Sequence, residues 1–258
     1  MLIAAFSGQL PFTELLNKLF GGVVTSLLES LGIHPHDAHA PIPNYIAMQV
    51  LVALVLIGFF VLVRRRLSVD NPGPVQNLAE FFHDFVKNLG HELMGHGYEP
   101  FLPFLATLGL FILTCNLIGL VPSLESPTAN PSVPLGCAVM AFCYYNFQGV
   151  RKQGLLRYAA HFAGPSDPGI NIVIRIIIAL LMVPIELISH TARMLSLTVR
   201  LFANIFAGDM LGLVAFSLIP IGVPLIPQGL HLMVSIVQTY IFVLLTTVYL
   251  SEAMAEEH

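Results

Sequence analysis

Residues 170–218 read INIVIRIIIALLMVPIELISHTARMLSLTVRLFANIFAGDMLGLVAFSL, an almost continuous apolar run. Built as a single α-helix, this run is about 70 Å long, more than twice the roughly 30 Å thickness of the hydrocarbon core of a bilayer. Such a helix has to tilt strongly, break, or lie along another structure. Pro184 falls inside the run, and a proline inside a helix can kink it.

The whole chain has the composition of an integral membrane protein. Of its 258 residues, 56% are hydrophobic and 10% are charged, whereas a soluble domain carries about 25% charged residues. The net charge of −4 is too small to indicate nucleic-acid binding. Cys115, Cys137 and Cys143 all lie in apolar runs, so we expect them to be small core residues without a disulfide.

Other apolar runs flank the long one. They span approximately residues 45–63, 102–121, 133–150 and 230–250. Each is long enough to cross a bilayer as a helix. The sequence therefore predicts an all-α, polytopic membrane protein with about five membrane helices, in which residues 170–218 and 230–250 form a long helical hairpin.

Basic residues at the ends of two runs predict the topology. Arg64–Arg66 follow the first run, and Arg151, Lys152 and Arg157 follow the third. Because cytoplasmic loops carry an excess of Lys and Arg, both ends are expected in the cytoplasm. This places the N-terminus outside and the C-terminus in the cytoplasm. We expect residues 1–44 to form an outer or interfacial segment and residues 45–258 to form the membrane domain.

Polar residues recur on one face of the long run. Each residue of a helix advances by about 100°, which puts six polar residues within one arc: Glu186, Ser189, Arg193, Ser196, Arg200 and Asn204. Asp209 points nearly opposite to Arg200. In the last run His231 and Gln238 are seven residues apart and share a face. Two such stripes on a hairpin suggest a path for a small hydrophilic species.

Charges at this depth are costly, because a charged residue at a helix centre costs about 2.5–3.5 kcal/mol on insertion scales. Ionisable residues inside a membrane therefore suggest proton relays or counter-ions. The structural alternative is that Glu186 pairs with Arg193, or that both reach the interface. His190 lies beside the stripe, and it is either a member of the path or a packed histidine.

Several of these motifs resemble one family. The stretch SLTVRLFANIFAGDML with the upstream Glu186, the ending HLMVSIVQTYIFVLLTTVYLSEAMAEEH, and the segment NLIGLVPSLESPTANPSV are similar to subunit a of the bacterial F-type ATP synthase. Ala203 stands where the family often has glycine. The resemblance implies a membrane stator subunit with two aqueous half-channels, which carry protons to and from a carboxylate on the rotor ring and so couple proton flow to rotation and ATP synthesis.

The resemblance also implies roles for individual residues. Arg200 matches the family's essential arginine, which faces the rotor carboxylate. The other residues that match the family's half-channels are Asn204, Asp209, His231 and Gln238 on the outer side and Glu186 and Ser196 toward the cytoplasm. Ser189, which lies in the polar arc, and the adjacent His190 are included in the path because of their position on the helix. The implied partners are a ring of small two-helix subunits, the peripheral-stalk subunit b, the rest of the ATP synthase complex and the lipid of a bacterial inner membrane. The last two helices of the family are steeply tilted, which agrees with the excess length of residues 170–218.

Other functions are less favoured. The sequence has no Gly-rich phosphate-binding loop, so we expect a non-catalytic subunit that binds neither ATP nor another cofactor. His91 and His96 of HELMGH are five residues apart, whereas the zinc-protease motif needs four. No metal site is expected there, and a solvated loop is favoured over adventitious metal binding at His34, His36 and His39. The alternative function is a stand-alone secondary transporter or ion channel, but no internal repeat typical of transporters is visible.

Overall fold

The computed structural model describes residues 10–30, 41–68, 71–95, 97–121, 124–154, 158, 172–218, 222 and 224–254. All regular structure within these ranges is helical, which confirms the all-α prediction. The long helices are α2 (Pro11–Ser30), α3 (Asn44–Arg65), α4 (Pro74–Met94), α5 (Leu102–Ile118), α6 (Ser132–Gln153), α8 (Ile172–Leu218) and α9 (Leu225–Met254). Two short 3-10 helices, η1 (Glu99–Phe101) and η2 (Pro127–Ala129), precede α5 and α6.

Among the described helices, four are long and apolar enough to cross a membrane: Asn44–Arg65, Glu99–Ile118, Ile177–Leu218 and Leu225–Met254. α6 matches the remaining expected span in position and has 22 residues. It is less apolar because Tyr144, Tyr145 and Asn146 lie in it, and it packs against both α8 and α9. These helices make the chain a multi-pass membrane protein.

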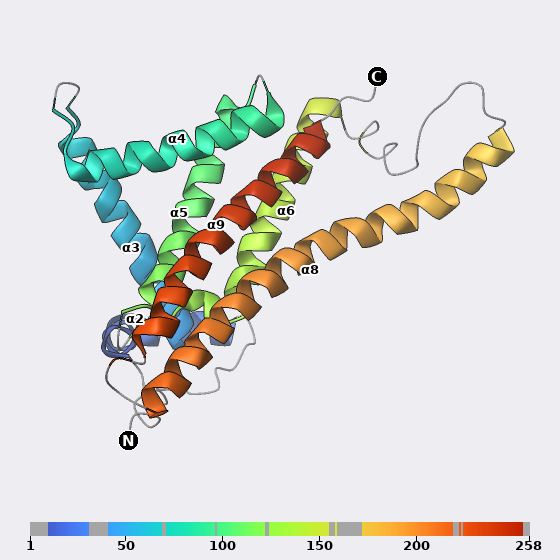
Figure 1. The fold of residues 1–258 in the computed structure, drawn as a ribbon. Coiled ribbons are helices and arrows are strands. Elements are labelled where there is room, and N and C mark those ends of the chain that lie inside the picture. Colours follow the sequence, from blue (N-terminus) through green and yellow to red (C-terminus); the bar gives the residue numbers. More distant parts are fainter. Residues whose placement is uncertain are drawn as a thin grey trace.

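The chain alternates between two ends of the molecule (Figure 1). α3 and α6 end, and α5 begins, at the end where α4 lies across the bundle. α2, the last turns of α5 and α8 and the first turns of α9 lie at the opposite end. The basic residues that close α3 and α6, Arg64, Arg65, Arg151 and Lys152, therefore lie at one end. Which side of the membrane this end faces stays a prediction.

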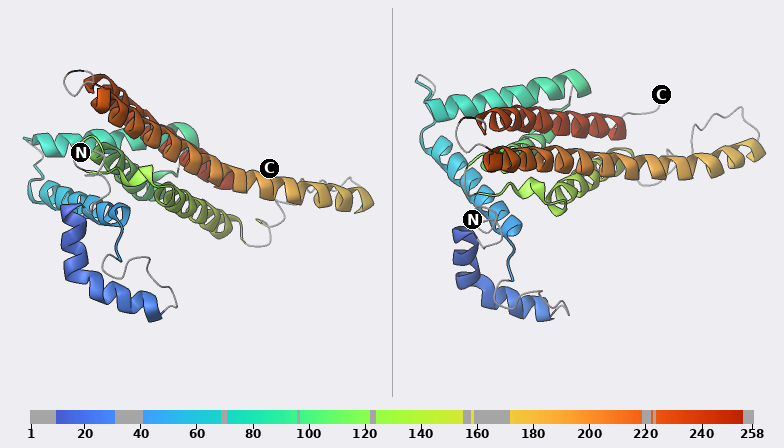
Figure 2. Two further views of the ribbon diagram at one scale, coloured as in Figure 1. Left: turned by 90° about the horizontal axis from the view of Figure 1, so that it is seen from below. Right: turned by 60° about the horizontal axis from the view of Figure 1, so that its bottom comes forward.

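α8 is a continuous helix of 47 residues that contains Pro184. The kink that Pro184 could cause does not divide the helix. Figures 1 and 2 show the second half of α8 packed alongside α9, as a hairpin, while its first turns extend beyond the bundle. A helix of 47 residues is longer than is needed to cross a bilayer along its normal. α8 runs obliquely to α5 (Figure 1), which accommodates part of this extra length.

Two elements differ from the sequence prediction. Residues 67–98 contain none of the predicted membrane helices, but they contain α4, which buries Val86 and Leu89 and exposes its charged side chains. α9 begins at Leu225, five residues before the expected start. Pro227 lies in its first turn, where a helix tolerates proline because the first N–H groups have no partner inside the helix.

Two apolar clusters hold the hairpin against the bundle. One joins α4, α5, α6 and α9 and includes Leu105, Val243 and Leu250. The other joins α5, α6, α8 and α9 and includes Leu201 and Phe242. Cys115 and Cys137 are buried as predicted, whereas Cys143 is exposed, because it lies on a side of α6 that no described helix covers. All three cysteines are free.

Candidate functional site

Most of the predicted site residues lie on α8 and α9, which pack against each other along the second half of α8. The two helices carry polar residues at corresponding heights, so that side chains from one helix reach those of the other. Three such contacts join the helices, at the turn of the hairpin, in its middle and near the end of α9. The candidate site is built from these contacts and from Arg200.

The contact nearest the turn joins Asp209 of α8 to His231 of α9. The carboxylate oxygen Oδ1 of Asp209 lies 3.3 Å from Nδ1 of His231, and the histidine is only 5% exposed. Gly208 makes this approach possible, because a Cβ atom at this position would lie 3.0 Å from Nδ1 of His231. The contact gives a carboxylate and an imidazole, two groups that can exchange a proton.

Two polar atoms beside this contact have no hydrogen-bond partner among the described residues. They are Nε2 of His231 and Oγ of Ser235, and both are buried. Buried polar groups in native proteins are nearly always paired with protein or with ordered water. These two atoms, one turn apart on α9, are therefore the ones in this contact whose hydrogen-bonding capacity is left unused by the described side chains.

The next contact along the hairpin joins Asn204 to Gln238. Asn204 precedes Asp209 by five residues on α8, and Gln238 follows His231 by seven residues on α9. The side-chain Nδ2 of Asn204 donates a hydrogen bond of 2.8 Å to Oε1 of Gln238. Gln238 is buried, whereas Asn204 is exposed at the surface of α8. This amide pair therefore connects the interior of the hairpin with the surface of α8 close to Arg200.

Arg200 differs from the other described arginine of the polar stripe. Its Nη2 donates a long hydrogen bond of 3.4 Å to Oγ of Ser196, one turn earlier, and no carboxylate pairs with it among the described residues. Arg193 instead forms an ion pair with Glu252 of α9 and lies 4.9 Å above the ring of Tyr249. The alternative pairing of Arg193 with Glu186 is wrong, because α9 supplies the carboxylate.

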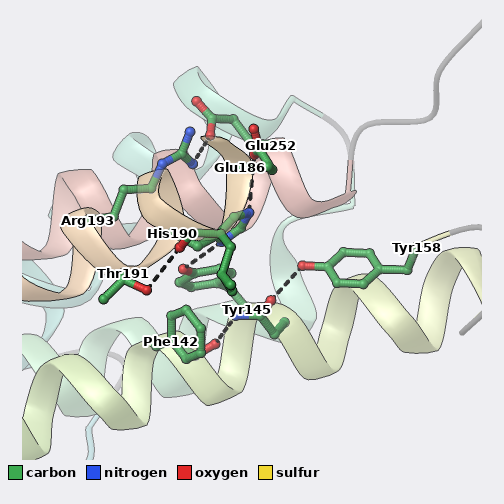
Figure 3. Close-up of polar contacts among 10 residues, drawn as sticks. Phe142, Tyr145, Tyr158, Glu186, His190, Thr191, Arg193 and Glu252 are labelled. Carbon is green, nitrogen blue, oxygen red and sulfur yellow. Dashed lines mark hydrogen bonds and ion pairs between the residues drawn. The ribbon is translucent and has the colours of Figure 1, made fainter. Parts of the chain in front are cut away.

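A second polar cluster lies near the first half of α8 (Figure 3). Nε2 of His190 lies 3.3 Å from Oε1 of Glu186, and Nδ1 of His190 lies 3.3 Å from the hydroxyl of Tyr145 on α6. Tyr158 donates a hydrogen bond of 2.7 Å to Oδ1 of the neighbouring Asn146. Ser189 makes no hydrogen bond in the described part of the chain. His190 is thus both packed and placed between two groups that exchange protons, so both interpretations of it stay open.

A third polar group, not predicted from the sequence, centres on Asn116 of α5. Oδ1 of Asn116 accepts a hydrogen bond of 2.7 Å from Thr128 of η2, and its Nδ2 lies 3.4 Å from Oγ1 of Thr239 and 3.5 Å from the carbonyl oxygen of Ser235. These residues are buried. The run 102–121 carries no charge, so the signal in the sequence that points to this group is the uncharged amide of Asn116 within a largely apolar span.

Of the histidines considered as metal ligands, His91 on α4 lies among the described residues. The ring of His91 lies edge-on to the ring of Tyr98, with the centroids 5.8 Å apart. His96 and the group His34, His36 and His39 lie outside the described residues. Chemically, the described site offers polar groups on both sides of the stretch of α8 that carries Arg200. The Asp209–His231 and Asn204–Gln238 contacts, with the Asn116 group beside α9, lie toward the end of α8, and the cluster of Glu186, His190 and Tyr145 lies toward its start.

Comparisons with known proteins agree with this architecture. Residues 46–251 match the family model described as "ATP synthase A chain". The chain is 48% identical to "ATP synthase subunit a" of Koribacter versatilis over 97% of its length and 98% of the relative's. It is 44% identical to the protein of the same name from Solibacter usitatus over 94% of this chain and 99% of the relative. The corresponding protein of Campylobacter fetus is 38% identical over 85% of this chain and 95% of the relative. The chain therefore belongs to the ATP synthase A chain family, as a multi-pass membrane subunit of an ATP synthase complex that serves the proton transport linked to ATP synthesis.

Proposed function

We propose that this chain is the stator subunit that couples proton flow to rotation, with Arg200 facing a carboxylate on each passing subunit of a rotor ring. Two aqueous half-channels lead to this point from opposite sides of the membrane. The family membership counts against the alternative of a stand-alone transporter or channel.

The observation that carries the proposal is the contrast between the two arginines. Arg193 has a carboxylate partner within the chain, Glu252, whereas Arg200 has only the hydroxyl of Ser196 among the described residues. An arginine in a membrane cannot relieve its desolvation by losing its proton, and intramembrane charges are normally paired. Because no carboxylate of the described residues pairs with Arg200, a carboxylate from another subunit is the partner that fits it.

The chemistry of arginine suits this role. A rotor carboxylate surrounded by lipid has to be neutral, since an isolated charge there is strongly desolvated. Beside Arg200 the carboxylate is stabilised in its ionised form, so it releases one proton and accepts the next. The permanent charge also repels protons between the two half-channels. Each elementary charge that crosses delivers about 2.3 kcal/mol per 100 mV, which a direct leak would dissipate.

The polar clusters supply the two half-channels. We assign Asp209, His231, Asn204 and Gln238 to the outer half-channel, because their contacts begin near the hairpin turn, at the end that carries α2. Toward the cytoplasm, the half-channel is lined by four residues of α8: Glu186, Ser189, His190 and Ser196. The contact between His190 and Tyr145 supports adding the tyrosine to this group.

The same reasoning gives the orientation and the partners. The basic ends of α3 and α6 lie at the end that α4 covers, and this end is proposed to face the cytoplasm. The N-terminus is then outside and the C-terminus inside, in a bacterial inner membrane. The rotor ring contacts the exposed face of α8, and the peripheral-stalk subunit b is a further partner.

Photocrosslinking tests the proposed ring contact. A photoreactive residue at Val199, which is 58% exposed on α8 beside Arg200, is compared with the same residue at Ile57, which is 60% exposed on α3. In the intact complex, position 199 should crosslink to a small two-helix subunit and position 57 should not. Equal crosslinking at both positions, or crosslinking of 199 to lipid alone, would show that Arg200 does not face the ring.

A further inference from the structure

Glu125 lies at the outer end of the molecule, in the segment that connects α5 to η2. This segment is fixed in place by hydrogen bonds: Ser126 donates to the carbonyl oxygen of Cys115 over 2.9 Å, and its Oγ lies 2.8 Å from Oγ1 of Thr128. η2 itself contacts α3, α5, α6 and α8. The carboxyl of Glu125 is therefore held at the junction of several helices and does not lie on a free loop.

The surroundings of Glu125 let it hold a proton and also release it. The side chain is half-buried, and the side chain of Asn44, at the start of α3, hydrogen-bonds to it. Burial raises the pKa of the Glu125 carboxyl above its usual value, and the hydrogen bond from Asn44 opposes this rise by a smaller amount. No Lys or Arg among the described residues forms an ion pair with Glu125.

Glu125 is also connected to the contact between Asp209 and His231. Thr128, three residues after Glu125, donates a hydrogen bond of 2.7 Å to Oδ1 of Asn116, and Nδ2 of Asn116 lies 3.5 Å from the carbonyl oxygen of Ser235, one turn after His231. Oδ1 of Asp209 lies 3.3 Å from Nδ1 of His231. The opposite ring nitrogen of His231 is buried without a hydrogen-bond partner in the described structure. When Nδ1 carries the proton toward Asp209, Nε2 has a free lone pair. Three titratable groups, from the connecting segment, α8 and α9, thus lead from the outer end into the hairpin.

The polar lining continues beyond His231. The unpartnered Oγ of Ser235 lies one turn farther along α9, and Asn116 reaches the same turn from α5. Gln238 follows and is bonded to Asn204. The series therefore ends beside Arg200, with no apolar turn of α9 between its members.

We propose that Glu125 is the outermost proton-accepting group of the outer half-channel and supplies the Asp209–His231 pair. This inference rests on the proposed function of the chain. The Glu125 carboxylate takes a proton from the outer water and becomes a neutral carboxyl. It returns to the carboxylate when this proton moves, directly or through water, to Asp209 or to Nε2 of His231. No bond other than those to the proton changes.

The test measures proton flow through the complete ATP synthase in vesicles under an imposed potential, with the pH varied separately on each side. Glu125→Gln keeps the shape and a hydrogen-bonding group but cannot carry a proton. We expect a several-fold lower flow and loss of the dependence on outer pH, with an unchanged dependence on inner pH. In the wild type, inward flow should fall as the outer pH rises through the pKa of Glu125, because the carboxyl then loses its proton.

Two variants serve as controls. Glu125→Asp keeps a titratable carboxyl and should retain much of the flow. Glu29→Gln removes an exposed carboxyl of α2 at the same end and should leave the flow unchanged. The amount of each variant in the purified complex measures its folding and assembly. If Glu125→Gln alters the response to both sides equally, the glutamate is structural and the inference is wrong.

Arg200→Ala, measured in parallel, separates this inference from the proposed function. If Glu125→Gln transports normally while Arg200→Ala loses coupling, the function stands and the role of Glu125 is refuted. If Arg200→Ala remains fully coupled, the proposed function itself fails, whatever the result for Glu125.

Discussion

Arg193 and Glu252 form an ion pair between α8 and α9, although 59 residues separate them in the chain. The side chain of Arg193 is 26% exposed and that of Glu252 is 52% exposed, so the pair lies near the edge of the hairpin. Tyr249 covers the guanidinium from one side. This pairing neutralises one of the two described arginines of the polar stripe, and it makes the lone charge of Arg200 distinctive.

The Arg193–Glu252 pair is expected to stabilise the hairpin without taking part in coupling. Arg193→Ala should lower the stability of the chain by on the order of 1 kcal/mol, since partly exposed ion pairs contribute little. Proton pumping per ATP should stay close to that of the wild type in the complex that assembles. The exchange of both charges, Arg193→Glu with Glu252→Arg, should recover the melting temperature lost in either single variant. A loss of coupling in Arg193→Ala would contradict this prediction.

Arg200 is expected to be essential for coupled synthesis. Arg200→Lys should abolish it, because an ammonium lacks the planar fork of the guanidinium and can lose its proton when desolvated. Arg200→Ala should in addition let vesicles that contain only the membrane sector lose an imposed potential faster than wild-type vesicles do. Without the cation, protons can pass by way of the rotor carboxylate and bypass a full turn of the ring.

The measurements are proton flux into sector-only vesicles and ATP-driven pumping by the whole enzyme. Association with the ring should persist in Arg200→Ala, since the surrounding surface of α8 is unchanged. If Arg200→Ala pumps at nearly the wild-type rate, Arg200 has only a structural role.

The contact between Asp209 and His231 predicts a rescue. Asp209→His alone replaces the carboxylate that lies 3.3 Å from Nδ1 of His231 with a second imidazole and should reduce proton flux strongly. Asp209→His combined with His231→Asp restores one carboxylate and one imidazole, and should transport more protons than the single variant. Equal flux in the single and double variants would show that the two residues act independently.

Gly208 provides a steric test of the same contact. Gly208→Ala puts a methyl group 3.0 Å from Nδ1 of His231, so the ring has to move by a few tenths of an ångström. We expect a several-fold lower proton flux in an assembled complex. Gly212→Ala is the matched control, because a Cβ there meets nothing within 4 Å. Both substitutions favour the helix by up to about 1 kcal/mol, so a lower flux in Gly212→Ala as well would attribute the effect to helix stiffness.

Labelling of single cysteines tests the orientation. Glu29 of α2 and Glu92 of α4 are exposed at opposite ends of the molecule. In a background without Cys115, Cys137 and Cys143, a cysteine at position 29 should react with an impermeant reagent from the outside, and one at position 92 from the cytoplasmic side. Reaction of both from one side would refute the proposed topology.

The sequence was sufficient to predict the membrane helices, because long apolar runs leave few alternatives to a helix. Their bounds agree to within about three residues, except that α9 begins five residues before and ends four residues after the expected run. α4 was missed because its apolar residues are spaced among charged ones and form only one face. An amphipathic helix of this kind gives no long apolar run.

The partners of the site residues could not be predicted in the same way. Helical periodicity gave the faces of α8 and α9, but the register between the helices depends on packing around residues such as Leu201 and Phe242. This register brings Glu252, and not Glu186, to Arg193. The packing of α5 against α9 likewise decides that Asn116 reaches Ser235, which is 119 positions away in the chain.

The absence of a carboxylate beside Arg200 in the described structure also has a consequence for the biogenesis of the chain. A newly inserted copy carries this charge into the bilayer at a cost of about 2.5–3.5 kcal/mol, and in the described part of its own fold only the long hydrogen bond to Ser196 opposes that cost. Docking against a subunit that supplies the missing anion recovers this energy. Arg200 therefore favours the assembled complex over the isolated chain. A copy that has not assembled is expected to be less stable than one that has.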